Sequence, residues 1–173
     1  MKSDDIVARA LRSVSNGCVY KLGKGGFSPV NPVPWSSSGH CDCSGFVSWA
    51  IGVSRQTDNP WYKKQNGGWF ETSAIVADCK TPFGFFDSVE WNQAKPGMLL
   101  VWGDSKTATG VRQGHVGIVS GIVTTGLKMG EPNTVIHCSS GNFRKTGCAI
   151  QETDVKIFRT NNAIVARCAF VEP

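Results

Sequence analysis

The chain has 173 residues, of which 40% are hydrophobic and 18% are charged. This length favours a single domain over residues 1–173, with a core that buries roughly 70% of the surface exposed in the unfolded chain. The composition is that of a globular protein and excludes a fibrous repeat or a wholly disordered chain. The net charge of +5 comes from scattered lysines and arginines, so no nucleic-acid partner is expected.

The amino-terminal stretch MKSDDIVARALRSVSNG carries acids at positions 4 and 5 and arginines at positions 9 and 12. These charges interrupt the apolar core that a signal peptide needs. No other run approaches the ~18 apolar residues of a membrane-spanning helix. We therefore expect no transmembrane segment and synthesis in the cytoplasm as a soluble protein.

Helices are expected in the first half of the chain. Apolar positions from Ile6 to Val14 recur at helical spacing before the stop signal Asn16–Gly17. Glycines and the prolines at 29, 32 and 34 predict a loop over residues 23–40. From Cys43 the helical spacing resumes and continues to Gly52, and a third, shorter helix is expected within residues 67–79.

Strands are expected in the second half. The segments GMLLVW, GHVGIVSGIV, NTVIHCSS and AIVARCAFV are rich in apolar and β-branched residues and are separated by turn-forming residues. Helices followed by strands predict an α+β fold in which N-terminal helices pack on a central antiparallel sheet.

Candidate chemistry begins in SSSGHCDCSGFVSWAIGV, where Cys41 and Cys43 flank Asp42 at the start of the second predicted helix. A thiol at a helix start meets free backbone N–H groups and the positive end of the helix dipole, and both favour the thiolate. The small residues Ser44 and Gly45 would let a substrate approach, and the same N–H groups could bind an oxyanion. Cys43 is therefore a candidate nucleophile.

A cysteine nucleophile needs a base, and the chain has three histidines. His40 adjoins the cysteines in an awkward direction, whereas His115 shares a strand face with the small Gly117. If the strands of His115 and His137 form a hairpin centred near Gly126, the two imidazoles face each other. One would then be the base and the other its orienting partner.

Other kinds of site fit less well. The Cys-x-Cys spacing is tighter than usual for zinc and lacks a second knuckle, so neither a metal nor a cofactor is expected. Redox Cys-x-x-Cys and Gly-x-Ser-x-Gly motifs are absent. The seven cysteines leave at least one unpaired. Cys138 and Cys148 would form a disulfide only in an oxidising compartment.

The segments CDCSGFVSWA, KPG followed by Trp102, GHVGIV and VIHCSSG resemble, in this order, the motifs of the NlpC-type cell-wall cysteine peptidases. The resemblance runs from about Tyr20 to about Gly141 and implies a papain-like fold. It implies that Cys43 is the nucleophile, His115 the base and His137 the third member of a triad. Cys41 is then a bystander.

The resemblance also implies a substrate. Tyr20 matches a family tyrosine near the oxyanion or the substrate amine, and Asp42 and Ser44 match positions that hold the peptide. The implied activity is hydrolysis of peptidoglycan stem peptides at the D-glutamyl to diamino-acid bond. Two departures concern the substrate: Met98 stands where the family commonly has an acidic residue, and the loop of residues 28–39 is long.

Several settings and two other functions stay open. The enzyme would act on the cell wall after lysis or delivery by a secretion system, or on muropeptides in the cytoplasm. A secreted effector would have an immunity or inhibitor protein as a partner. The alternatives are an acyltransferase or amidase with a non-wall substrate on the same fold, or a non-catalytic phage or secretion module.

Overall fold

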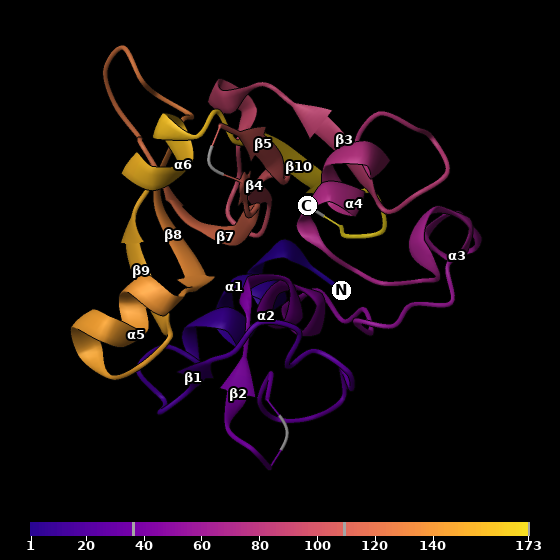
Figure 1. The fold of residues 1–173 in the computed structure, drawn as a ribbon. Helices are drawn as coiled ribbons and strands as arrows, with labels where there is room; N and C mark the ends of the chain where they lie inside the picture. Colours follow the sequence, from indigo (N-terminus) through magenta and orange to yellow (C-terminus); the bar gives the residue numbers. More distant parts are fainter. Residues whose placement is uncertain (36, 109, 173) are drawn as a thin grey trace.

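An antiparallel sheet in the order β3-β10-β4-β7-β8-β9 organises the chain (Figure 1). The computed structural model describes residues 1–35, 37–108 and 110–172. The strands of this sheet are β3 (Phe86–Val89), β4 (Leu99–Trp102), β7 (His115–Ile122), β8 (Pro132–Cys138), β9 (Ile150–Asp154) and β10 (Ile164–Cys168). Each neighbouring pair is antiparallel, which confirms the α+β class and the antiparallel sheet.

Helices cover both faces of the sheet. The helical elements are α1 (Ser3–Leu11), α2 (Cys43–Ala50), α3 (Pro60–Asn66), α4 (Thr72–Asp78), the 3-10 turn η1 (Trp91–Gln93), α5 (Ser140–Thr146) and α6 (Lys156–Thr160). Helices α1, α2 and α4 pack on the face that carries Val101, Val116 and Ile136. Helix α6 packs on the opposite face through Phe158. None of the described helices is long and apolar enough to cross a membrane.

Helix α2 lies in the core because its sequence has no polar face. All eight of its residues are buried, including Cys43 at its first position, as expected for a helix that is small or apolar all round. Asp42 caps the helix by accepting a hydrogen bond from the Gly45 backbone N–H at 2.9 Å. A Cβ at position 45 would lie 2.4 Å from the Lys24 carbonyl oxygen, so the loop packs closely only on a glycine.

The sequence predicted the central elements better than the peripheral ones. The first, second and third expected helices correspond to α1, α2 and α4, and the four expected strands correspond to β4, β7, β8 and β10. Not predicted were α3, α5, α6, β3 and β9. Two short pairs were also missed: β1 (Val19–Tyr20) with β2 (His40–Cys41), which is parallel, and β5 (Ser105–Thr107) with β6 (Gly110–Arg112).

Candidate active site

Cys43 is the first residue of α2 and is only 5% exposed. The backbone N–H of Val116, the residue that follows His115 in β7, acts to lower the pKa of the Cys43 thiol. Burial, together with the negative charge of Asp42, raises the pKa of the Cys43 thiol to about 12. The helix start was expected to favour the thiolate, but here the loss of solvent outweighs it and Cys43 is a neutral thiol.

His115 and His137 form a hydrogen-bonded pair. His115 Nε2 lies 2.7 Å from His137 Nδ1, as the expected pairing of the two histidines requires. The expected register is wrong by two residues: Ile118 lies opposite Ile136, so position 117, and not His115, lies opposite His137. The turn is thus centred near Leu127 instead of Gly126, and the histidines meet diagonally on one face.

The pair is enclosed by aromatic rings and is largely dry. Trp102 and Phe158 lie 5.3 and 5.5 Å from the His115 ring, measured between centroids. Burial lowers the pKa of His115 well below its usual value and lowers the pKa of His137 to about 4. Both imidazoles are therefore neutral near pH 7, which suits a base but provides no resting imidazolium.

Cys43 and His115 belong to different sides of the sheet. Cys43 belongs to the cluster beneath α2, whereas the His115 ring contacts the Trp102 and Phe158 rings on the α6 face. The thiol and the imidazole share no hydrogen bond in this structure. Helix α2, which begins with Cys43, packs against β7, which begins with His115, and catalytic hydrogen bonds often tighten only when substrate binds.

A cavity of about 340 Å³ opens over Cys43. Its wall includes Tyr20, Asp42 and Ser44, the three residues expected to bind substrate, and its far rim reaches Gly114, next to His115. The remaining residues of the wall are Leu22, Gly23, Arg55, Trp69, Glu71, Thr72, Asp104 and Gln113. Chain segments distant in sequence therefore meet around the candidate nucleophile.

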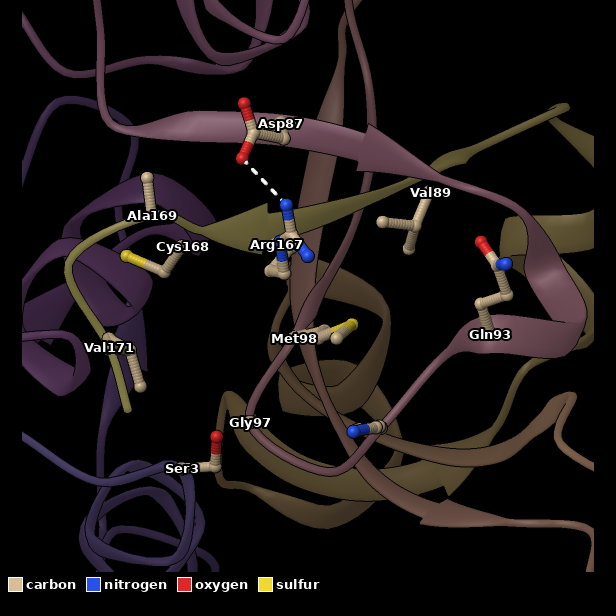
Figure 2. A pocket seen from close by; sticks show the side chains of 11 residues that line it. Ser3, Asp87, Val89, Gln93, Gly97, Met98, Arg167, Cys168, Ala169 and Val171 are labelled. Carbon is tan, nitrogen blue, oxygen red and sulfur yellow. Dashed lines mark hydrogen bonds and ion pairs between the residues drawn. The ribbon is translucent and has the colours of Figure 1, made fainter. Parts of the chain in front are cut away.

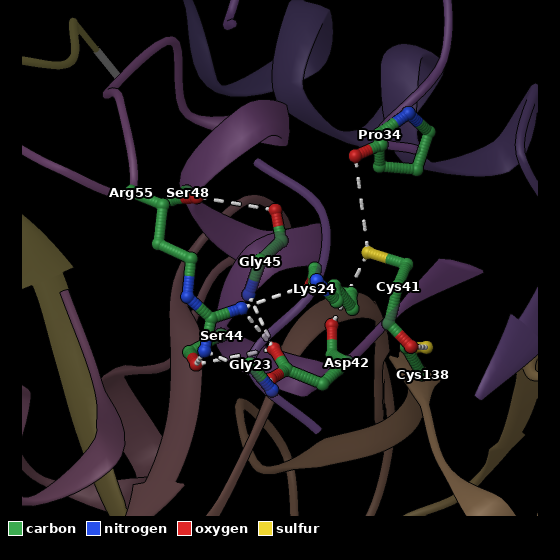
Figure 3. Close-up of polar contacts among 10 residues, drawn as sticks. All are labelled: Gly23, Lys24, Pro34, Cys41, Asp42, Ser44, Gly45, Ser48, Arg55 and Cys138. Atoms are coloured by element: carbon green, nitrogen blue, oxygen red, sulfur yellow. Dashed lines mark hydrogen bonds and ion pairs between the residues drawn. The ribbon is translucent and has the colours of Figure 1, made fainter. Parts of the chain in front are cut away.

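Asp42 lies at the centre of a buried polar network (Figure 3). Its carboxylate accepts hydrogen bonds from the Gly23 N–H at 2.6 Å and from Arg55 Nη2 at 2.8 Å, and Arg55 Nη1 bonds the other oxygen. Arg55 also donates to Ser44 Oγ at 3.0 Å. The carboxylate that was expected to hold the stem peptide is thus paired with the Arg55 cation. In this structure it caps the first turn of α2.

Tyr20 borders the same cavity as a neutral phenol. Its pKa is raised by burial and by the neighbouring charges that Cys43 and Asp42 would carry. The protonated hydroxyl can donate a hydrogen bond. Tyr20 and Cys43 line the same cavity, as expected of a tyrosine beside the nucleophile.

The other cysteines take no part in this site. All seven are free thiols, so Cys138 and Cys148 are not bridged here. Cys41 is fully buried, and the Cys138 thiol donates to its carbonyl oxygen at 3.5 Å. Among the described residues, no group of three or more His, Cys, Asp or Glu side chains is arranged to hold a metal ion.

A separate cavity of about 640 Å³ lies where β3 and β10 meet the N-terminus of α1 (Figure 2). Its most polar wall is the ion pair between Arg167 and Asp87, at 3.0 Å. None of the residues expected to act in catalysis or substrate binding lines it.

Sequence reasoning missed three contributors to the candidate site. Arg55 follows Cys43 by twelve positions and lies beyond the helix end, so no local pattern links it to Asp42. Thr153, whose hydroxyl lies 3.0 Å from His137 Nε2, is in a strand that was not predicted. Trp69, over which the Arg55 guanidinium lies at 4.6 Å, was not distinguished from the other tryptophans.

Comparisons with known proteins assign no family. No model of a known protein family matches the chain, and no curated protein matches it.

Proposed function

We propose that this protein is a cysteine peptidase with a papain-like, NlpC-type fold that hydrolyses peptidoglycan stem peptides. One observation carries the proposal: Cys43 begins a buried helix beneath a cavity whose rim leads to His115, and His115 Nε2 is hydrogen-bonded to His137 Nδ1. Nucleophile, base and orienting group are the three parts that a thiol peptidase needs.

In the proposed mechanism, the free Nδ1 of His115 removes the Cys43 proton as the sulfur attacks the amide carbonyl. The carbon–nitrogen bond then breaks, and His115 returns the proton to the leaving amine. Water hydrolyses the acyl-enzyme with His115 again as the base. Because Cys43 and His115 are both neutral at rest, proton transfer accompanies attack instead of preceding it.

The bond we propose is the one between D-glutamate and the diamino acid. Asp42 is paired with Arg55, so the amine of a free stem would bind the wall carboxylates that have no arginine partner: Glu71, which also caps α4, and Asp104, which also accepts from the Gly114 N–H. Tyr20 closes one side over the small L-alanine. The substrate is the cell wall after lysis or secretion, or cytoplasmic muropeptides, and an effector would be paired with an immunity protein.

Mass spectrometry of purified muropeptides before and after incubation tests the proposal. The wild-type protein should release L-Ala-D-Glu and a diamino-acid fragment from soluble tri- and tetrapeptide stems. Cys43→Ala should abolish release, whereas Cys41→Ala should retain most of it. Cleavage at the lactyl amide or at a D-Ala cross-link would contradict the proposed bond.

A non-catalytic binding module is the second candidate. The raised pKa of Cys43 and the missing bond between its thiol and His115 favour it. Absence of cleavage of any muropeptide, together with an alkylation rate of Cys43 unaffected by muropeptides, would support this candidate. An acyltransferase or amidase on another substrate would show cysteine-dependent turnover without wall products.

A further inference from the structure

The histidine pair continues into a third side chain, Thr153 of β9. His137 Nε2 lies 3.0 Å from Thr153 Oγ1, and the Thr153 hydroxyl donates its proton to the Asp154 carbonyl oxygen at 3.0 Å. A hydroxyl has one proton to donate. With that proton given to the Asp154 carbonyl, Thr153 can only accept from His137, which requires the His137 proton to be on Nε2.

Asn142 is the only other described polar side chain recorded near His137 Nε2, at 3.5 Å from its Nδ2. Its two amide protons already point to better acceptors, the carbonyl oxygens of His137 at 3.1 Å and Ala149 at 3.3 Å. Asn142 thus does not compete for the ring, and it leaves the bond to Thr153 as the one that selects the tautomer.

The tautomer of His137 determines the tautomer of His115. With its proton on Nε2, a neutral His137 has a bare Nδ1, which accepts from His115 Nε2 at 2.7 Å. His115 then has its own proton on Nε2 and a bare Nδ1. We propose that Thr153 is a positioning residue that sets the tautomers of both histidines and so leaves His115 Nδ1 unprotonated.

The rings can respond to Thr153 because both are neutral. Burial lowers the pKa of each, so each ring has one proton to place and two nitrogens to place it on. A third cavity, of about 460 Å³, is lined by His137, Thr153 and Asn142, and it does not include Cys43. Thr153 therefore borders a different cavity from the one over Cys43.

The tautomers can be measured directly in the full chain. With three histidines, long-range proton–nitrogen correlation spectra of the ¹⁵N-labelled protein resolve each ring, and His40 is an internal reference. The wild type should have protonated Nε2 and bare Nδ1 in His115 and His137. Thr153→Val should populate the Nδ1-protonated form of His137, because valine offers no acceptor, and Thr153→Ser should keep the wild-type spectrum.

The matched control is Thr134→Val. Thr134 lies on the neighbouring strand opposite Asp154 and bonds Ser120 Oγ at 3.0 Å, so it should leave both tautomers unchanged. The proposal is overturned if Thr153→Val keeps the wild-type tautomers, if Thr153→Ser shifts them as Thr153→Val does, or if Thr134→Val shifts them as well.

The catalytic consequence rests on the proposed function. Thr153→Val should lower kcat for muropeptide hydrolysis about tenfold with KM unchanged, and Thr153→Ser should restore it. The two readouts separate the claims. A wild type that cleaves nothing contradicts the peptidase proposal, while the nitrogen spectra still decide the role of Thr153.

Discussion

His115 Nε2 and His137 Nδ1 lie 2.7 Å apart although the two residues are not opposite each other in the β7–β8 ladder. The position opposite His137 is occupied by Gly117, and a Cβ placed there would lie 2.9 Å from the Cβ of His137. The missing side chain lets the His115 ring reach diagonally across the sheet. The histidine pair therefore depends on a glycine that takes no part in chemistry.

Gly117→Ala should separate the pair. The added methyl would lie 2.7 Å from Val135 Cγ2 and 3.0 Å from Phe158 Cζ, so His137 and its neighbours must shift. We expect a loss of about 1–3 kcal/mol in the free energy of unfolding and a fall in kcat. Chemical denaturation and muropeptide turnover measure the two effects.

Gly141→Ala is the matched control for that substitution. Position 141 lies in α5, and its added Cβ would meet only Ser139 Oγ, at 3.7 Å. It should stabilise the protein by about 0.5–1 kcal/mol, since alanine favours helix. Equal stability of the Gly117→Ala and Gly141→Ala proteins would contradict the crowding argument.

Stability should fall in mild acid because the histidines are buried as neutral rings. The pKa of His137 is lowered from 6.5 to about 4. Between these pH values the unfolded chain binds a proton at His137 and the folded chain does not. The contribution of the neutral His137 ring to the free energy of unfolding is present in full above pH 6.5 and is lost as the pH falls toward 4. It amounts to roughly 3 kcal/mol, and the lowered pKa of His115 acts in the same direction.

The measurement is the free energy of unfolding across this pH range. His137→Asn keeps a side chain that can hydrogen-bond and removes the titrating ring, so its stability should fall less steeply than that of the wild type. Parallel curves for the wild type and His137→Asn would show that His137 is not the titrating group.

The parts of the fold that were predicted are those in which local pattern and burial agree. Helix α2 and strand β7 have nearly continuous apolar runs and lie in the centre of the core. Strand β9, with the sequence IQETD, was missed because it is an edge strand whose alternate residues face solvent. Its pairing with β8 is set by tertiary structure, which leaves little trace in a short polar segment.

In the candidate site, too, local features were predicted and features that depend on tertiary contacts were missed. The positions of Cys43 at a helix start and of the two histidines on paired strands were predicted because helix-start and strand patterns are local in the sequence. Arg55 was missed because its partner, Asp42, is brought to it by the fold and not by spacing. The protonation state of Cys43 was also missed, since burial depends on every segment that covers the thiol.

Alkylation should reveal that protonation state. With a pKa of about 12 and little exposure, Cys43 should react with iodoacetamide slowly near neutral pH. Its rate should rise about tenfold per pH unit as the thiolate fraction grows. Cys79 has a pKa raised to the same value but is more exposed, so it should react faster than Cys43. Peptide mass spectrometry showing faster modification of Cys43 than of Cys79 near neutral pH would mean that the thiolate is preformed.

The buried ion pair beneath the cavity should contribute far more to stability than its counterpart on the surface. Arg55 pairs with Asp42 and lies over Trp69, with both charged side chains almost fully buried. Arg159 has the same two kinds of partner, Glu131 and a tryptophan ring at 4.7 Å, but its side chain is 38% exposed.

Arg55→Ala leaves the Asp42 carboxylate buried without its cation, so we expect a loss of about 3–5 kcal/mol in the free energy of unfolding. Arg159→Ala should cost at most about 1 kcal/mol, because water replaces the lost contacts. Adding Asp42→Asn to Arg55→Ala should restore part of the loss, since the uncompensated charge is then gone. Chemical denaturation of the three variants gives the comparison. Similar losses for Arg55→Ala and Arg159→Ala, or no recovery in the double variant, would show that the Asp42 charge is not what makes the Arg55 substitution costly.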